Sequence, residues 1–261
     1  MKVTIIKIRR KYYNIPTDWN ELTADQLLQV MDVFSNKNYA PEQTLLKLLK
    51  ILLSMSYRKW FTLKAEDVEE YIYLVGFIFF ETNYLTKQLI PMHNGFYGPS
   101  DEIGNMVMKE FVFSEHFFMQ WQDDKENLDL LHSFIATIYR RSKPNYNFYW
   151  NPDGDPRTEF NENICEWNAK HFIAGWPLNI KQAIAHWYGS CRLKLVDDNP
   201  EVFGGTGEPA KHGLISIIRD VAKNGAYGKF DEVENIPVNL MMIELNEVVE
   251  EGKKLEQEMK K

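Results

Sequence analysis

The chain has 261 residues, enough for one large domain or two small ones. A hydrophobic fraction of 44% and an aromatic fraction of 14% supply material for a core and exclude disorder over most of the length. The net charge of −7 argues against a protein whose main surface binds nucleic acid. The longest apolar run, Tyr71–Phe80, is too short to span a bilayer.

The charge is unevenly distributed along the chain. Residues 1–64 carry 11 Lys and Arg against 5 Asp and Glu, whereas residues 65–135 carry 3 against 13. A basic front and an acidic middle can dock head to tail between copies, or they can be solvated faces of one monomer. The basic residues Lys7, Arg9, Arg10 and Lys11 can contact phosphates or an acidic subunit.

The first elements are a β arm and three helices. Val3–Tyr13 alternates apolar and polar residues, which predicts a strand or extended arm. Thr23 followed by Gln26 forms a capping-box pattern, which predicts a helix over 24–35, and Pro41 begins the next helix. A third helix is expected to contain residues 68–82, apolar nearly all round and therefore central and buried.

The rest of the chain is predicted to be helical, with three breaks. Residues 95–100 and 204–209 are rich in Gly, which predicts a loop and a flexible joint, and 145–159 predicts a surface excursion. Further helices are expected over residues 109–122, 126–141, 161–174, 177–196, 211–224 and the terminal segment from 237. We therefore predict a mostly α fold: an N-terminal β arm over 1–20, a helical core over 21–203 and a projecting C-terminal helical extension over 204–261.

The terminal helix carries the clearest pattern in the chain. Its seam residues follow at spacings of 4, 3, 4, 3 and 4: Met241, Leu245, Val248, Gly252, Leu255 and Met259. This a/d rhythm is typical of a helix that packs on another helix. Gly252 leaves a gap in the seam and costs about 1 kcal/mol of helix stability relative to Ala. A helix this short is only marginally stable in isolation. We therefore expect it to dock on a preformed surface of another protein. We also expect the domain to stay folded when residues 241–261 are removed.

Candidate chemical sites are few. Asp153, Asp155 and Glu162 fall at positions 3, 5 and 12 of a calcium-loop frame, but Pro156 occupies the position that requires Gly, so a turn is favoured over a metal site. His186 beside Trp187 is expected to be a packed histidine. Cys165 and Cys191 lack CxxC spacing and predict buried thiols in a reducing compartment. We expect no catalytic residue, no metal and no cofactor.

Four segments resemble uncharacterised proteins of phages and prophages of Bacteroidetes bacteria, including crAss-like phages. They are IPTDWNELT (15–23), DLLHSFIATIYRR (129–141), QAIAHWYGSCR (182–192) and HGLISIIRDVA (212–222). The resemblance covers most of the chain and consists of packing patterns, so it transfers no catalytic residue. It implies a virion or tail-assembly component: a tail, collar or ring protein, or an assembly chaperone.

This resemblance, with the charge pattern and the terminal seam, predicts a non-enzymatic structural protein of a phage virion, assembled as a multi-copy collar or tail ring near the portal vertex. Its expected partners are copies of itself and other virion proteins such as the portal, with DNA reached only through a channel wall and no membrane. The expected contact residues are Val3, Ile5, Arg9, Arg10, Met241, Leu245, Val248, Leu255 and Met259. Such a protein resides in the virion, and in the host cytoplasm during assembly. The alternatives are a tail-assembly chaperone absent from the mature particle and a metal-dependent enzyme.

Overall fold

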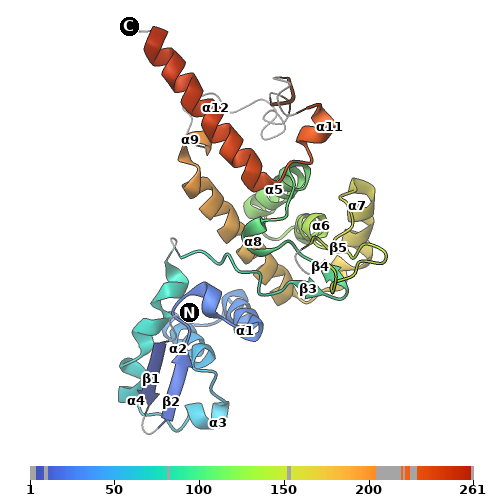
Figure 1. The fold of residues 1–261 in the computed structure, drawn as a ribbon. Coiled ribbons are helices and arrows are strands. Elements are labelled where there is room, and N and C mark those ends of the chain that lie inside the picture. The colour runs from blue at the N-terminus through green and yellow to red at the C-terminus, as the bar shows by residue number, and fades with distance from the viewer. Residues whose placement is uncertain are drawn as a thin grey trace. The chain divides into compact units, whose positions relative to one another are not determined.

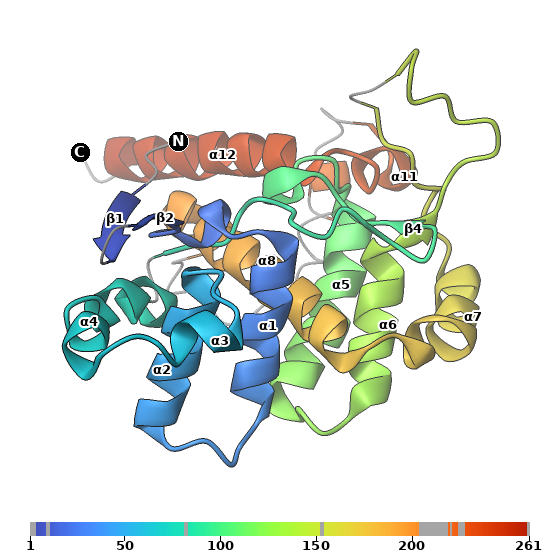
Figure 2. The same cartoon turned by 90° about the horizontal axis from the view of Figure 1, so that it is seen from below.

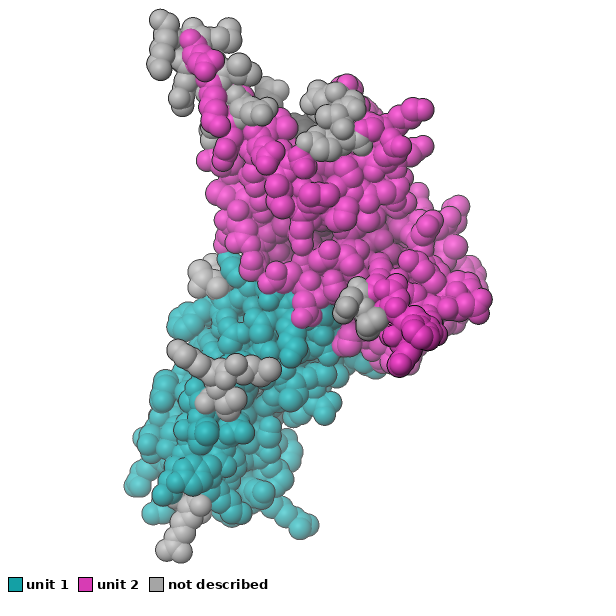
Figure 3. Space-filling view, viewed as in Figure 1, with its two compact units in different colours: residues 1–90, 177–187 teal, residues 91–176, 188–261 magenta. Residues whose placement is uncertain are grey.

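The computed structural model describes residues 4–8, 11–80, 83–151, 154–203, 219, 221–223 and 228–259. It is mostly helical with a small sheet near the N-terminus, as the sequence predicts. The chain divides into two compact units (Figure 3): unit 1 comprises 1–90 and 177–187, and unit 2 comprises 91–176 and 188–261. Within the described part of the chain, no helix has both the length and the apolar character needed to cross a membrane.

This division does not follow the boundaries expected from the sequence. Residue 203 ends neither unit, and helix α8, Leu178–Asp198, contributes residues to both. The predicted joint at 204–209 lies outside the described residues, and so does most of the helix predicted over 211–224.

The N-terminal segment of unit 1 forms a hairpin (Figure 1). Strand β1, Thr4–Ile8, pairs antiparallel with β2, Lys11–Ile15. Ile6, Ile8 and Ile15 are buried, while Ile5 on the opposite face is 62% exposed. The chain therefore folds back on itself over the range predicted as one extended arm, because one face of the hairpin is apolar enough to be buried within unit 1.

The segment after the hairpin is held by side-chain hydrogen bonds. Asp18 caps the short helix η1, Trp19–Glu21, and Thr23 with Gln26 forms the predicted capping box of α1, Ala24–Ser35. The Asn20 side chain accepts hydrogen bonds from the backbone N–H groups of Thr86 and Lys87, each at 2.8 Å. It thereby joins this segment to residues 84–87, far along the chain.

The prediction of an α-helix over residues 68–82 is wrong. After α2, Pro41–Leu52, the chain forms two short helices, α3 (Tyr57–Trp60) and α4 (Ala65–Glu69), and then the 3₁₀ helix η2, Ile72–Phe79. A 3₁₀ helix places every third residue on one edge, and its Tyr73 and Phe79 are 69% and 51% exposed. The apolar run is therefore buried on one side only. The buried residues are Leu74, Val75, Phe77 and Ile78.

Unit 2 is built around two long helices. α5, Met108–Asp123, and α6, Leu128–Ile138, lie side by side, and α7, Glu162–His171, packs against α6 (Figure 2). The remaining elements are short: η3 (Asp101–Ile103), η4 (Ile173–Gly175), α9 (Pro200–Phe203) and α11 (Phe230–Val233). The last is followed by α12, Val238–Met259. The predicted long helices of this unit differ from the observed ones by a few residues at each end.

A small sheet replaces part of the loop predicted at 95–100. Strands β3, Met92–His93, and β4, Phe96–Tyr97, form a hairpin, and β4 also pairs with β5, Arg140–Arg141. The turn residues Asn94 and Gly95 both have positive φ, 49° and 75°, as a tight I′ hairpin turn requires. The Asn-Gly pair is a sequence signal for such a hairpin, and the prediction of a loop did not use it.

Candidate interaction surfaces

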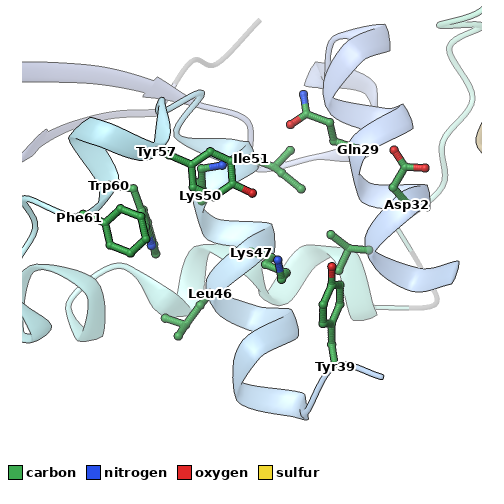
Figure 4. A pocket seen from close by; sticks show the side chains of 11 residues that line it. Gln29, Asp32, Tyr39, Leu46, Lys47, Lys50, Ile51, Tyr57, Trp60 and Phe61 are labelled. Carbon is green, nitrogen blue, oxygen red and sulfur yellow. The ribbon is translucent and has the colours of Figure 1, made fainter. Parts of the chain in front are cut away.

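The first candidate site is a surface pocket of unit 1 with a volume of about 340 Å³. Its floor is α2, which turns Leu48, Leu49 and Leu52 into the core and leaves Leu46, Lys47 and Lys50 outside. Figure 4 shows the α3 aromatics on one side of α2 and Gln29, Asp32 and Tyr39 on the other. The amphipathic period of α2 thus places two lysines and a leucine between an aromatic wall and a mostly polar wall that contains Tyr39.

Both lysines of the pocket lie over aromatic rings. Lys50 Nζ is 3.2 Å from the centroid of the Tyr57 ring, and Lys47 Nζ is 4.3 Å from that of Tyr39. Tyr57 stacks on Phe61 with centroids 6.4 Å apart, and these two rings are 62% and 79% exposed. A cation over a ring face is attracted by the ring quadrupole, which orients the ammonium groups without neutralising them.

The segment that supplies most of the pocket lining is basic. Residues 43–64 contain five Lys and Arg and no Asp or Glu. The one acidic residue that lines the pocket, Asp32 of α1, accepts a hydrogen bond from Asn179 at 3.2 Å. Among the described residues, neither Lys47 nor Lys50 forms an ion pair with a carboxylate of the chain. The pocket therefore offers positive charge next to exposed apolar surface.

The second candidate site is α12, whose seam has two different halves. Val238, Met241 and Met242 are fully buried in unit 2, and the Val238 N–H donates to the Met106 carbonyl at 2.9 Å. Leu245 is half-buried and Val248 is 47% exposed. Apart from the backbone of α12 itself and the adjoining residues, no described atom lies within 4 Å of the position that a Cβ at Gly252 would take. The seam thus belongs to the unit 2 core up to about Leu245 and is open beyond it.

The open half of α12 extends beyond the rest of unit 2 (Figure 1). Its last side-chain anchor among the described residues is Asn246, which donates to Asn199 Oδ1 at 2.6 Å. The whole helix carries six Glu against two Lys, so it is acidic. Leu255 and Met259, predicted as contact residues, have side chains outside the described part, and the same holds for Val3, Arg9 and Arg10 near the N-terminus.

The calcium-loop frame does not provide a free ligand at Asp155. Its carboxylate accepts hydrogen bonds from Arg157 Nε, Nη2 and backbone N–H, each at 2.9 Å. Burial alone would raise the pKa of Asp155, but the hydrogen bonds and charge of Arg157 outweigh it and hold that pKa below its ordinary value. Asp153 lies outside the described residues, and among those described no group of three or more metal-ligating side chains gathers.

Arg157 instead belongs to a buried ion cluster of unit 2. Glu110 of α5 lies between Arg140, to which it is hydrogen bonded, and Arg157 Nη2 at 3.2 Å. All three side chains are at most 5% exposed. Arg140 also donates to the carbonyls of Thr137 and Thr158, each at 2.7 Å. The end of the predicted excursion at 145–159 is therefore anchored inside unit 2, while Tyr149 and Trp150 within it are about four-fifths exposed.

The thiols and the central histidine are packed groups. Burial raises the pKa of Cys165 to about 11 and that of Cys191 to about 12, so neither supplies a thiolate near neutral pH. His186 lies on Trp19, with ring centroids 4.4 Å apart, as the prediction of a packed histidine implies. Its Nε2 is inaccessible and makes no hydrogen bond to any described residue, and burial lowers its pKa to about 4.

Comparison of the chain with known protein families, with curated proteins and with solved structures gives no match. The candidate sites therefore rest on their own geometry. The α12 seam is visible in the sequence, whereas the pocket of unit 1 is not among the predicted sites. A signal for it exists in residues 43–64, where five basic residues occur without an acidic one and three aromatic residues follow at 57, 60 and 61.

Proposed function

We propose that this chain is a non-enzymatic structural protein of a phage virion, assembled in several copies as a collar or tail ring near the portal vertex. The resemblance to phage and prophage proteins suggests the particle. The observation that carries the docking role is α12, which extends an apolar seam with Val248 half exposed and open space at Gly252. A seam with this spacing is made to pack on another surface.

In a ring, identical subunits join head to tail, so each subunit needs two different and complementary patches. The ring closes when the rotations between neighbours add up to a full turn. The basic, aromatic pocket on unit 1 and the acidic open half of α12 on unit 2 are two such unlike patches. Their difference in charge sign favours contacts between unlike faces over contacts between like ones.

The test is the mass and shape of the purified full-length protein. Light scattering at increasing concentration should show a defined multi-copy species, and negative-stain micrographs should show rings. A strictly monomeric protein at high concentration that also binds no portal, collar or tail protein would overturn the proposal.

A tail-assembly chaperone is the second candidate, favoured by the exposed aromatic edge of η2. Tyr73, Phe79 and Phe80 are each more than half exposed, and such apolar surface can hold an aggregation-prone partner. Mass spectrometry of purified virions separates the two functions. A ring protein is present at a fixed copy number, whereas a chaperone is absent from the mature particle.

A further inference from the structure

We propose that the open half of α12 docks into the Lys47/Lys50 pocket on unit 1 of a second copy of the same chain. This inference rests on the proposed function and gives its ring a specific contact: an acidic helix from one protomer and a basic, aromatic pocket from the next. Each protomer then uses one pocket and one helix.

The pocket has the chemistry to receive an amphipathic acidic helix. Leu46, Tyr57 and Phe61 present 40%, 62% and 79% of their surfaces to solvent around the pocket, which is apolar area that a helix can cover. Lys47 and Lys50 are held over aromatic rings at the same place. Carboxylates that flank an apolar seam can therefore meet ammonium groups while the seam covers the leucine and the rings.

The open half of α12 has the complementary pattern. Val248 continues the seam beyond Leu245 and is 47% exposed. Glu247 and Glu250 are exposed on either side of Val248 in sequence. Outside the helix's own backbone and the adjoining residues, no described atom lies within 4 Å of the position that a Cβ at Gly252 would take, so a partner surface can approach the backbone closely there.

A second copy is the occupant that the charges favour. Residues 43–64 carry five basic residues without an acidic one, and α12 carries six Glu against two Lys. Apolar burial would supply most of the binding free energy, and the opposite charges would set the orientation and the salt dependence. An unlike pair of patches on each chain gives a head-to-tail contact, which is the kind that builds rings.

The decisive experiment uses two full-length variants that each spoil one half of the contact. Lys47→Glu with Lys50→Glu reverses the pocket and keeps α12, whereas Val248→Arg spoils α12 and keeps the pocket. Each variant alone should self-associate about a hundredfold more weakly than the natural chain, because like charges or a charge against apolar surface then meet at the contact. An equimolar mixture should form a one-to-one dimer and nothing larger, since it contains one intact pocket and one intact helix that can pair.

Two controls show whether a loss of self-association comes from this contact. Lys87→Glu reverses an exposed lysine of unit 1 that does not line the pocket, and it should leave self-association unchanged. Circular dichroism and thermal melting of each variant establish that it is folded. All the substituted side chains are at least partly exposed, so the variants should fold.

The outcomes distinguish this inference from the proposed function. Rings that persist in both variants would overturn the helix-in-pocket contact and leave the ring proposal standing. A natural chain that stays monomeric at high concentration would overturn the contact, and if it also binds no portal, collar or tail protein it would overturn the proposed function as well. Folded variants whose mixture forms no dimer would also overturn the contact between copies. If the lysine reversal abolishes binding of a fluorescent single-stranded oligonucleotide while self-association is unchanged, the pocket binds nucleic acid and the inference is wrong.

Discussion

The ion cluster of unit 2 and the pocket of unit 1 place positive charge in opposite surroundings. In unit 2, Arg140 and Arg157 are buried on both sides of Glu110. Their other donors reach backbone carbonyls and, from Arg157, the Asp155 carboxylate. In unit 1, Lys47 and Lys50 lie at the surface over aromatic rings. The charges of the buried cluster are paired within the chain, whereas the two lysines keep their charge available to another molecule.

The largest expected effect tests the buried side of this contrast. Glu110→Ala should destabilise unit 2 by about 3–5 kcal/mol, because it leaves the buried Arg140 without a carboxylate and Arg157 with Asp155 alone. Chemical denaturation followed by tryptophan fluorescence measures the change. The control is Glu166→Gln, which removes an exposed pair with Lys170 and should leave the unfolding midpoint unchanged. A small effect of Glu110→Ala would mean that the cluster is not an energetic part of the fold.

The next effect compares buried and open positions on one helix. Met241→Ala should cost about 2–5 kcal/mol because Met241 is fully buried in unit 2. Val248→Ala, at the exposed part of the seam, should change stability by less than about 0.5 kcal/mol. Thermal melting of the two variants measures the difference. Equal losses at the two positions would place Val248 inside the core and remove the open half of the seam.

A buried histidine, whose Nε2 has no hydrogen-bond partner among the described residues, tests unit 1 by pH. His186 has a pKa of about 4 in the folded chain against 6.5 ordinarily, so the unfolded chain binds more protons between these values. The stabilisation is fully present above pH 6.5 and should be lost at up to about 1.4 kcal/mol per pH unit as the pH falls toward 4. Denaturation midpoints at a series of pH values should show this slope. His186→Leu should flatten it, and an unchanged slope would mean that other groups cause it.

The smallest expected effect lies on the exposed side of the contrast. Reversal of Lys47 and Lys50 to Glu should change the free energy of unfolding by less than about 0.5 kcal/mol, because surface substitutions rarely do more. Its consequence should instead appear in self-association. A large loss of stability would show that the lysines support unit 1 itself, and the contrast between the two units would then fail.

Local patterns predict the fold better than the sites. The capping box at Thr23 and Gln26 locates α1 to the residue because both hydrogen bonds form within four residues of sequence. The helix predicted at 68–82 is wrong because an apolar segment without periodicity does not distinguish a buried helix from a 3₁₀ segment with an exposed edge. The expectation that the domain stays folded without residues 241–261 sets the cut too early in α12, because Met241 and Met242 are buried in the core of unit 2.

The site residues that sequence patterns do not reveal depend on tertiary packing. Tyr39 precedes α2 and Tyr57 follows it, and only the turn after α2, with Ser54 at positive φ, places Tyr57 over Lys50. Likewise, the polar sequence around Arg157 predicts a surface residue, but its side chain is completely buried. It forms an ion pair there with Glu110, which lies 47 residues earlier in the sequence. The Glu110–Arg157 pair joins distant parts of the sequence and leaves no local pattern, and the composition of residues 43–64 does not show which rings the lysines contact.

The division of α8 between the units has a consequence for synthesis of the chain on the ribosome. Unit 1 takes residues 177–187 after the whole first segment of unit 2 has been made. Its core needs Trp187, whose Nε1 donates to the Thr86 carbonyl at 3.1 Å, and His186, which lies on Trp19. The N-terminal residues therefore emerge first but cannot complete their core until nearly a hundred further residues are translated. A fragment that ends at residue 90 should for the same reason expose its apolar side chains and aggregate.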